Sequence, residues 1–341
     1  MDLQKHYAKT IAGINSMLTD GIVPGFSYVI FEGDDQLKKV QGNLQVRPTT
    51  EPLHDGTLYD VASLTKVIGT VPVICQLANE GRIILDFPLH RYLPGFKDEN
   101  PTLRNLITHT SGIGGYIPRR NEMPKDLLTA ALLTQLKVGP NLNRMISYTD
   151  INFIFLGWVA EAVTGKPIQQ LITERVLQLL QMNSSSFHPD PQRCAPTVID
   201  PKRGLLRGQV HDPKAAILGD RCGSAGLFTT IDDLTKYSRA LIETDLAGQL
   251  ESWNIDDMFE DQTPLDGDHS RSLGWKLFHT RGKNPHLVIS HTGYTGTWMI
   301  LDRQTDSGII FLSNQVNTGT DRQVFLKRRD QIMATYLNEK Q

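Results

Sequence analysis

Strand-like segments stand at both ends of this chain, and helical segments fill its middle. Strands are expected at 26–31, 37–42, 57–61, 273–278, 287–290, 297–302 and 308–313, where β-branched and aromatic residues gather between turn residues. Helical patterns cover 3–19, 63–79, 124–136, 150–164, 168–180, 230–243 and 321–338. Because strands come from both termini, we expect an α+β fold: an antiparallel sheet flanked by helices, with an inserted, mainly helical lobe.

The length also favours two lobes, since 341 residues exceed a typical single core. We expect residues 1–62 and 222–341 to form the α/β sheet lobe, and residues 63–221 to form the mainly helical lobe. Residues 183–221 show no clear periodicity and are interpreted as a long surface connection. An active site is expected in the cleft between the two lobes.

The charge balance and the cysteines narrow the possible partners. The 35 Lys and Arg residues are balanced by 37 Asp and Glu residues, and no basic run stands out, so we expect no nucleic-acid partner. No apolar run could span a membrane, and the first residues lack the apolar core of a signal peptide, which favours a cytoplasmic protein. Cys75, Cys194 and Cys222 show neither a disulfide framework nor zinc spacing, so no metal or cofactor is expected. The oligomeric state stays open.

The stretch Val61-Ala62-Ser63-Leu64-Thr65-Lys66 has the features of a nucleophilic serine site. A helix is expected to begin at or just before Ser63 and to end near Gly81, with Pro72 as a kink inside it. Residues three apart on a helix share a face, so Ser63 and Lys66 should lie together. At the helix start, free backbone N–H groups can stabilise a developing anion, and an amine beside a hydroxyl can activate it.

Two further stretches carry reactive side chains. Ser147-Tyr148-Thr149-Asp150 precedes the helix at 151–164, and Ser290-His291-Thr292-Gly293-Tyr294-Thr295-Gly296 ends a strand. Nearby residues are interpreted structurally: His109 as a residue that hydrogen-bonds a loop, and Thr230 with Asp233 as a capping box.

With these motifs in this order, the chain resembles the superfamily of serine beta-lactamases and penicillin-binding proteins. The similar branch holds class C beta-lactamases, serine D,D-peptidases and family VIII-type esterases. The resemblance rests on five motifs: Ser-x-x-Lys, Leu-Ile-Thr-His-Thr-Ser-Gly, the Tyr-x-Asn position, Gly-Leu-Phe-Thr-Thr-x-x-Asp-Leu and the His/Lys-Thr-Gly strand. It covers nearly the whole chain and implies the two-lobed fold of this superfamily.

The resemblance also implies roles for single residues. Ser63 would be the nucleophile that forms an acyl-enzyme, and Lys66 would help to deprotonate its hydroxyl. Tyr148 matches the tyrosine that carries protons to the leaving group and activates water. The backbone N–H groups of Ser63 and Tyr294 would form the oxyanion hole. His291, Thr292 and Gly293 would line the substrate site.

Two departures from the family pattern affect the expected substrate. Asp150 stands where asparagine is usual; it could pair with Lys66 and raise its pKa, hold a substrate ammonium group, or only cap the helix at 151–164. His291 replaces the lysine of beta-lactamases and supplies less positive charge when neutral. This disfavours a beta-lactamase and is compatible with D,D-peptidases and esterases.

Three functions therefore stay open. The leading hypothesis is a serine hydrolase that cleaves a small ester or amide through a Ser63 acyl-enzyme. The second is a D,D-carboxypeptidase or penicillin-binding protein acting on D-alanyl peptides or esters. The third is a catalytically silent binding domain of the same fold. The sequence has no Gly-x-Ser-x-Gly elbow, which disfavours an α/β-hydrolase.

Overall fold

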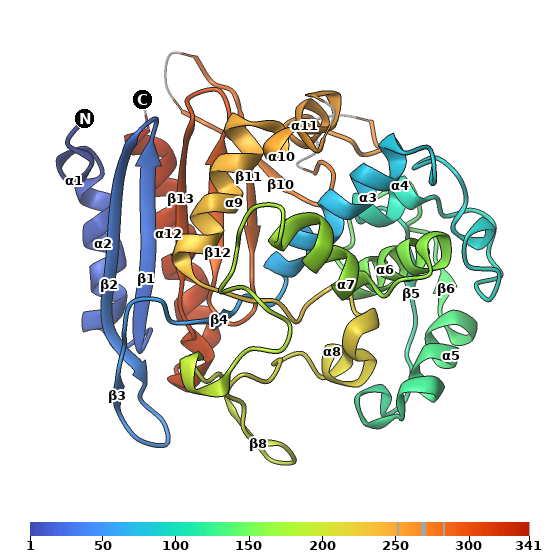
Figure 1. Ribbon diagram of the computed structural model, residues 1–341, viewed down its shortest axis with the longest axis horizontal. Coiled ribbons are helices and arrows are strands. Elements are labelled where there is room, and N and C mark those ends of the chain that lie inside the picture. Colours follow the sequence, from blue (N-terminus) through green and yellow to red (C-terminus); the bar gives the residue numbers. More distant parts are fainter. Residues whose placement is uncertain (251, 267–270, 282–283, 341) are drawn as a thin grey trace.

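One antiparallel sheet joins the two ends of the chain (Figure 1). The computed structural model describes residues 1–250, 252–266, 271–281 and 284–340. Its large sheet has seven strands in the order β10-β11-β12-β13-β1-β2-β3. Their bounds are β1 Gly25–Glu32, β2 Asp35–Gln45, β3 Glu51–Pro52, β10 Lys276–His279, β11 Leu287–Thr292, β12 Trp298–Asp302 and β13 Ser307–Leu312. The α+β fold predicted from the sequence is confirmed.

Helices cover both faces of this sheet (Figure 1). The terminal helices α1 (Leu3–His6), α2 (Ala8–Thr19) and α12 (Arg322–Glu339) pack on one face, and α9 (Ile231–Glu243) packs on the other. Because successive strand residues point to opposite faces, Tyr28 and Ile30 join the core under the terminal helices, while Val29 and Phe31 join the other core. Burial on both faces explains why β1 is apolar almost throughout.

The middle of the chain forms the helical half on the other side of α9 (Figure 1). Its elements are π-helix η1 Lys66–Thr70, α3 Val71–Asn79, α4 Leu103–Ile107, α5 Lys125–Gln135, α6 Asp150–Thr164, α7 Ile168–Ile172, π-helix η4 Thr173–Leu177 and α8 Pro213–Leu218. The remaining α-helices of the described residues are α10 Asp245–Gly248 and α11 Ser252–Met258. The short strands are β4 Tyr59–Asp60, β5 Ile113–Gly114, β6 Lys137–Val138, β7 Ile199–Asp200, β8 Gly204–Leu205 and β9 Phe228–Thr229. All strands of the large sheet come from 1–62 or 222–341, but the lobe boundaries themselves stay a prediction.

The segment after Ser63 is helical as predicted, but it contains a π-helical turn. Ala62 has a positive φ of 46° and turns the chain into the helix, whose first helical residue is Leu64. Over η1 the backbone widens, and the N–H of Val71 bonds to the carbonyl of Lys66. Pro72 follows directly. Since proline has no N–H to give, the wider turn just before it lets the helix continue into α3.

Two local predictions need correction. Residues 183–221 are more than a surface connection, because α8 and the loop before it turn inward and line the cleft described below. Thr230 does cap α9, but Asp233 does not complete a capping box. Its carboxylate instead accepts hydrogen bonds from the backbone N–H groups of Ser184 and Ser185, so it ties α9 to a distant loop.

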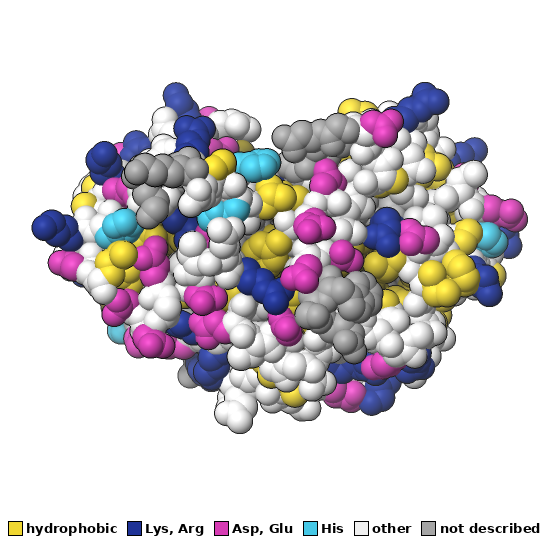
Figure 2. All heavy atoms as spheres, turned by 90° about the horizontal axis from the view of Figure 1, so that it is seen from above, with side chains coloured by type: hydrophobic (Ala, Val, Ile, Leu, Met, Phe, Trp, Pro, Cys, Tyr) yellow, Lys and Arg dark blue, Asp and Glu magenta, His cyan; other side chains and the backbone are white. Residues whose placement is uncertain are grey.

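Charge is evenly mixed over the face of the molecule in Figure 2, where Lys and Arg side chains alternate with Asp and Glu. Among the helices of the described residues, none is both long and apolar enough to cross a bilayer.

Candidate active site

A cleft of about 660 Å³ brings together the motifs that lie far apart in the sequence. Its walls include Ser63 from the helix start, Tyr148 and Asp150 from the start of α6, and His291 to Tyr294 from the end of β11. Elements of both the sheet and the helical half therefore form the site.

Lys66 is buried behind the lining of this cleft and holds the Ser63 hydroxyl. Its ammonium Nζ is 2.7 Å from Ser63 Oγ, 2.8 Å from Asp150 Oδ1 and 2.9 Å from the carbonyl oxygen of Ser224. The Lys66 side chain is fully buried, so water does not compete for these contacts. An ammonium group has three hydrogens, and each of them has an acceptor here. Lys66 is therefore fixed in one orientation beside the serine.

Asp150 is the first residue of α6, and its carboxylate binds two lysines. Oδ1 pairs with Lys66, and Oδ2 lies 3.3 Å from Nζ of Lys214, whose ammonium also contacts Asp212 at 2.8 Å. The cap of α6 is Thr149, whose hydroxyl accepts from the N–H of Ile151. The interpretation of Asp150 as only a helix cap is therefore wrong, and the alternative pairing with Lys66 is formed.

These charges keep Lys66 and Asp150 ionised near neutral pH. Burial disfavours the Lys66 ammonium, but the charge that Tyr148 can carry and the Asp150 carboxylate outweigh it, so the pKa of Lys66 is raised. Burial also opposes the Asp150 carboxylate, but the ammonium groups of Lys66 and Lys214 hold the pKa of Asp150 well below its usual range. Lys66 therefore rests as an ammonium ion, and any role as a base requires that it first lose a proton.

Tyr148 lies over Lys66 and is supported from behind by His109. The Lys66 ammonium is 5.3 Å from the centre of the Tyr148 ring. The centre of the His109 ring is 4.5 Å from the centre of the Tyr148 ring. His109 Nδ1 accepts hydrogen bonds from the backbone of Thr149 and the side-chain amide of Asn152. His109 thus holds the loop that carries Tyr148, in agreement with its structural interpretation. Tyr148 itself is 45% exposed and faces the cleft.

The end of β11 packs directly against the turn that carries Ser63. Thr295 donates a hydrogen bond to the carbonyl of Asp60 at 2.6 Å, and Thr297 donates one to the carbonyl of Val61. Gly293 lies between these contacts, where there is no space for a side chain. Within the described residues, the backbone N–H groups of Ser63 and Tyr294 donate no hydrogen bond, so both remain available to a substrate oxygen.

His291 lies on the same wall and is held in its neutral form. Burial first, and then the charges of Arg271 and Lys66, lower the pKa of His291 well below its usual range. Its Nδ1 is 3.1 Å from the carbonyl oxygen of Thr292, which places the proton on Nδ1. Nε2 is buried without a partner in the described part of the chain. A neutral His291 offers an acceptor to the site and supplies no fixed positive charge.

Sequence reasoning missed Lys214 and Arg271. Asp212-Pro213 is the local signal for Lys214, because Asp212 caps α8 and proline takes the first helical position, as is common at helix starts. The sequence before Arg271 has no periodic pattern and gives no such signal. Its guanidinium lies 5.7 Å from the Tyr148 ring centre, and its Nη1 is buried without a hydrogen-bond partner among the described residues.

Comparison with known proteins agrees with this architecture. The sequence profile of the Beta-lactamase family matches residues 11–332, which is most of the chain. The chain belongs to the beta-lactamase family. It is similar to a class C beta-lactamase structure with a TM-score of 0.77 and 18% identity, covering 99% of this chain and 98% of that one. The family and its relatives identify the protein as a beta-lactamase-related serine hydrolase.

Curated relatives of this family member include a carboxypeptidase and an amidase by name. A "Putative D-alanyl-D-alanine carboxypeptidase" of Escherichia coli (strain K12) is 27% identical over 76% of this chain and 69% of that protein. An "N-acetylmuramyl-L-alanine amidase" of Bacillus subtilis (strain 168) is 26% identical over 82% of this chain and 73% of that protein. These names describe the relatives.

Proposed function

We propose that this hydrolase cleaves a small ester or amide through an acyl-enzyme on Ser63. The observation that carries the proposal is the 2.7 Å contact between the Ser63 hydroxyl and the Lys66 ammonium at a helix start that lines the cleft. Such a pairing is the arrangement that an activated serine needs. The exposed phenol of Tyr148 above Lys66 adds a group that can carry protons.

The proposed reaction has two balanced steps. Ser63 Oγ attacks the substrate carbonyl and gives its proton to a base, either Lys66 as a free amine or Tyr148 as a phenolate; the leaving group departs with a proton from the same relay. Water then attacks the acyl-enzyme, releases the acid and returns the proton to Ser63. The free N–H groups of Ser63 and Tyr294 would bind the oxyanion in both steps, and losing one such donor costs about 3–4 kcal/mol.

Intact-protein mass spectrometry tests this proposal directly. The protein is incubated with p-nitrophenyl esters, a penicillin and a D-alanyl-D-alanine peptide, and the mass of any trapped adduct is mapped to a residue. We expect the adduct on Ser63, and Ser63→Ala should lose about a thousandfold or more in turnover. Ser184→Ala, outside the cleft, serves as the control. An adduct on another serine would refute the assignment, and no adduct with any substrate would favour the silent binding domain.

A D,D-carboxypeptidase is the second candidate, and Arg271 favours it. A carboxypeptidase substrate ends in a carboxylate, and Arg271 presents a buried Nη1 without a partner among the described residues. Burial lowers the pKa of this guanidinium, and no carboxylate of the described chain offsets that cost. A substrate carboxylate could complete this charge with a bidentate pair. The names of the curated relatives point to the same substrate class.

A further inference from the structure

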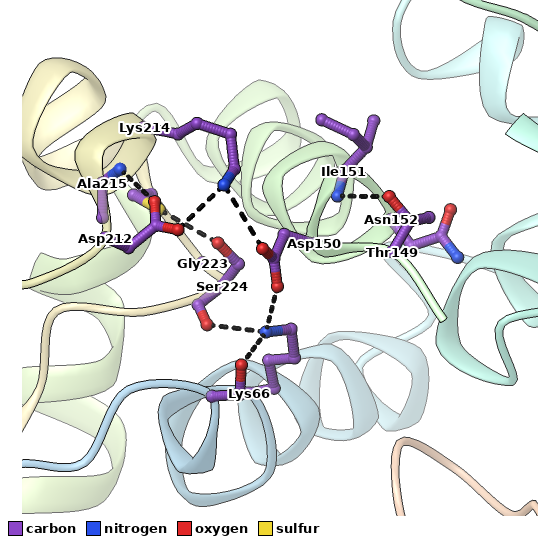
Figure 3. Close-up of polar contacts among 12 residues, drawn as sticks. Lys66, Thr149, Asp150, Ile151, Asn152, Asp212, Lys214, Ala215, Gly223 and Ser224 are labelled. Carbon is purple, nitrogen blue, oxygen red and sulfur yellow. Dashed lines mark hydrogen bonds and ion pairs between the residues drawn. The ribbon is translucent and has the colours of Figure 1, made fainter. Parts of the chain in front are cut away.

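Lys214 is a buried cation that the reaction proposed above does not use. It belongs to the short helix α8 and is 7% exposed. Its ammonium lies between two carboxylates, 2.8 Å from Asp212 and 3.3 Å from Asp150 (Figure 3). Two lysines and two aspartates thus alternate in one connected network, which runs from Asp212 through Lys214 and Asp150 to Lys66.

Asp150 is shared between the two lysines, one on each carboxylate oxygen. Figure 3 shows Lys66 and Lys214 on opposite sides of this carboxylate. Coulomb attractions add, so both cations feel the whole carboxylate charge, but the oxygens are divided: Lys214 binds Oδ2, and Lys66 contacts Oδ1. Lys66 and Lys214 are both buried, so solvent screens these interactions little. A change of charge at Lys214 should therefore change how readily Lys66 loses its proton, and this effect needs no contact between the two side chains.

Other charged and titratable groups also face Lys66 and Asp150. On the helical side these are His109 in the loop after α4, Tyr148 just before α6, and Asp212 in the loop before α8. On the sheet side they are Arg271 before β10 and His291 in β11. His109 and His291 have pKa values lowered by burial, so both are uncharged near neutral pH. Asp150 is the carboxylate in direct contact with Lys66, and Lys214 is the second cation bound to that carboxylate.

We infer that Lys214 is a positioning residue that limits how strongly Asp150 holds the Lys66 ammonium. By taking one carboxylate oxygen, it leaves Lys66 easier to deprotonate and keeps Asp150 oriented toward Lys66. This inference rests on the proposed Ser63 chemistry. It assigns Lys214 no contact with the reacting atoms; its effect passes through Asp150.

The test is the pH profile of kcat/KM for a neutral p-nitrophenyl ester. In Lys214→Met the aliphatic stem is kept and the charge is lost, so Asp150 interacts with Lys66 alone. We expect the acid limb to move to higher pH by about one unit or more, because Oδ2 of Asp150 is freed for Lys66 and an opposing positive charge is removed. Lys214→Arg keeps the charge and should restore the limb. Lys125→Met, which breaks a surface ion pair with Asp220, should leave it in place.

A double variant separates this mechanism from a general loss of structure. In an Asp150→Asn background, Lys214→Met should shift the limb far less, because the connecting carboxylate is gone. Full additivity of the two shifts would overturn the inference. An unmoved acid limb in an active, folded Lys214→Met protein would also overturn the inference. A KM increase restricted to anionic substrates would overturn it too, because it would indicate that Lys214 binds substrate.

A second measurement does not depend on turnover. The pKa of Lys66 can be followed by NMR of lysine-labelled protein, and it should be higher in Lys214→Met than in the wild type. If esters are not hydrolysed at all, the proposed function fails, while this titration still decides the role of Lys214. An unchanged Lys66 titration would refute the inference.

Discussion

Gly293 packs so closely against Val61 that a Cβ on the glycine would lie 2.4 Å from the Val61 carbonyl oxygen. This contact joins the end of β11 to the turn before Ser63. Together with the hydrogen bonds of Thr295 and Thr297, this contact sets the spacing between the two halves of the expected oxyanion hole. The lack of space for a Cβ therefore explains why the third position of the His-Thr-Gly motif is glycine in this chain.

Gly293→Ala should consequently lower both stability and activity. The added methyl forces the backbone of β11 away from Val61, which costs about 1–3 kcal/mol of unfolding free energy. It also moves the N–H of Tyr294. The fold decrease in kcat/KM should therefore be larger than the fold change in KM. Urea unfolding and ester turnover check this. Gly114→Ala is the matched control, since a Cβ there meets open space. An alanine variant as stable and active as the wild type would contradict the packing argument.

Asp150→Asn should make the enzyme active at lower pH. The charge that holds Lys66 as an ammonium ion is removed. The acid limb of the kcat/KM profile should therefore move to lower pH by about one pH unit or more. Both carboxylate oxygens are already paired with lysines, which argues against binding of a substrate amine. A variant with an unmoved limb but a higher KM for amine-bearing substrates alone would reverse this conclusion.

The same variant has a predicted stability signature. The pKa of Asp150 is lowered by folding, so its contribution is present above the unfolded value of about 4 and is lost as pH falls. At neutral pH the variant leaves two buried ammonium groups with less compensation, at a cost on the order of 3 kcal/mol. The stability gap to the wild type should shrink below about pH 4. A gap independent of pH would show that the charge is not its cause.

Arg271→Gln should discriminate between the two candidate functions. If Arg271 binds a terminal carboxylate, kcat/KM for a D-alanyl peptide should fall by about 10- to 100-fold, the usual effect of losing a charged hydrogen bond. The neutral p-nitrophenyl ester is the internal control and should be affected little. An equal loss for both substrates would indicate that Arg271 supports Tyr148 rather than the substrate.

Asp60 should make stability fall as pH rises. Its buried carboxylate accepts from the backbone N–H groups of Ala62 and His211, and burial raises its pKa from 3.8 to about 6. Between these values the folded state binds more proton than the unfolded chain, so the free energy of unfolding decreases with pH. The wild type should lose about 3 kcal/mol relative to Asp60→Asn between pH 4 and 7. Asp34→Asn, changed at an exposed hairpin turn, retains Asp60 and should keep the wild-type slope.

Local patterns in the sequence determined a large part of this structure. The strand at 26–31, the helix of α6 and the pairing of Ser63 with Lys66 all follow from short-range periodicity, because residues three apart on a helix share a face regardless of the rest of the fold. The motif order was also enough to indicate the family. The capping box predicted for Asp233 does not form, because a carboxylate near a helix start can bond to any nearby N–H, and here it accepts from those of Ser184 and Ser185.

Tertiary structure alone decided the electrostatics of the site. Lys214 and Arg271 come from segments without a regular pattern, and only folding places them beside Asp150 and Tyr148. Sequence spacing records which side chains share one helix or strand, but it carries no distance between separate elements. Burial then removes the water that would screen these charges, so distant residues set the ionisation of Lys66. The candidate nucleophile Ser63 could be predicted from the sequence, whereas the charges around it required the fold.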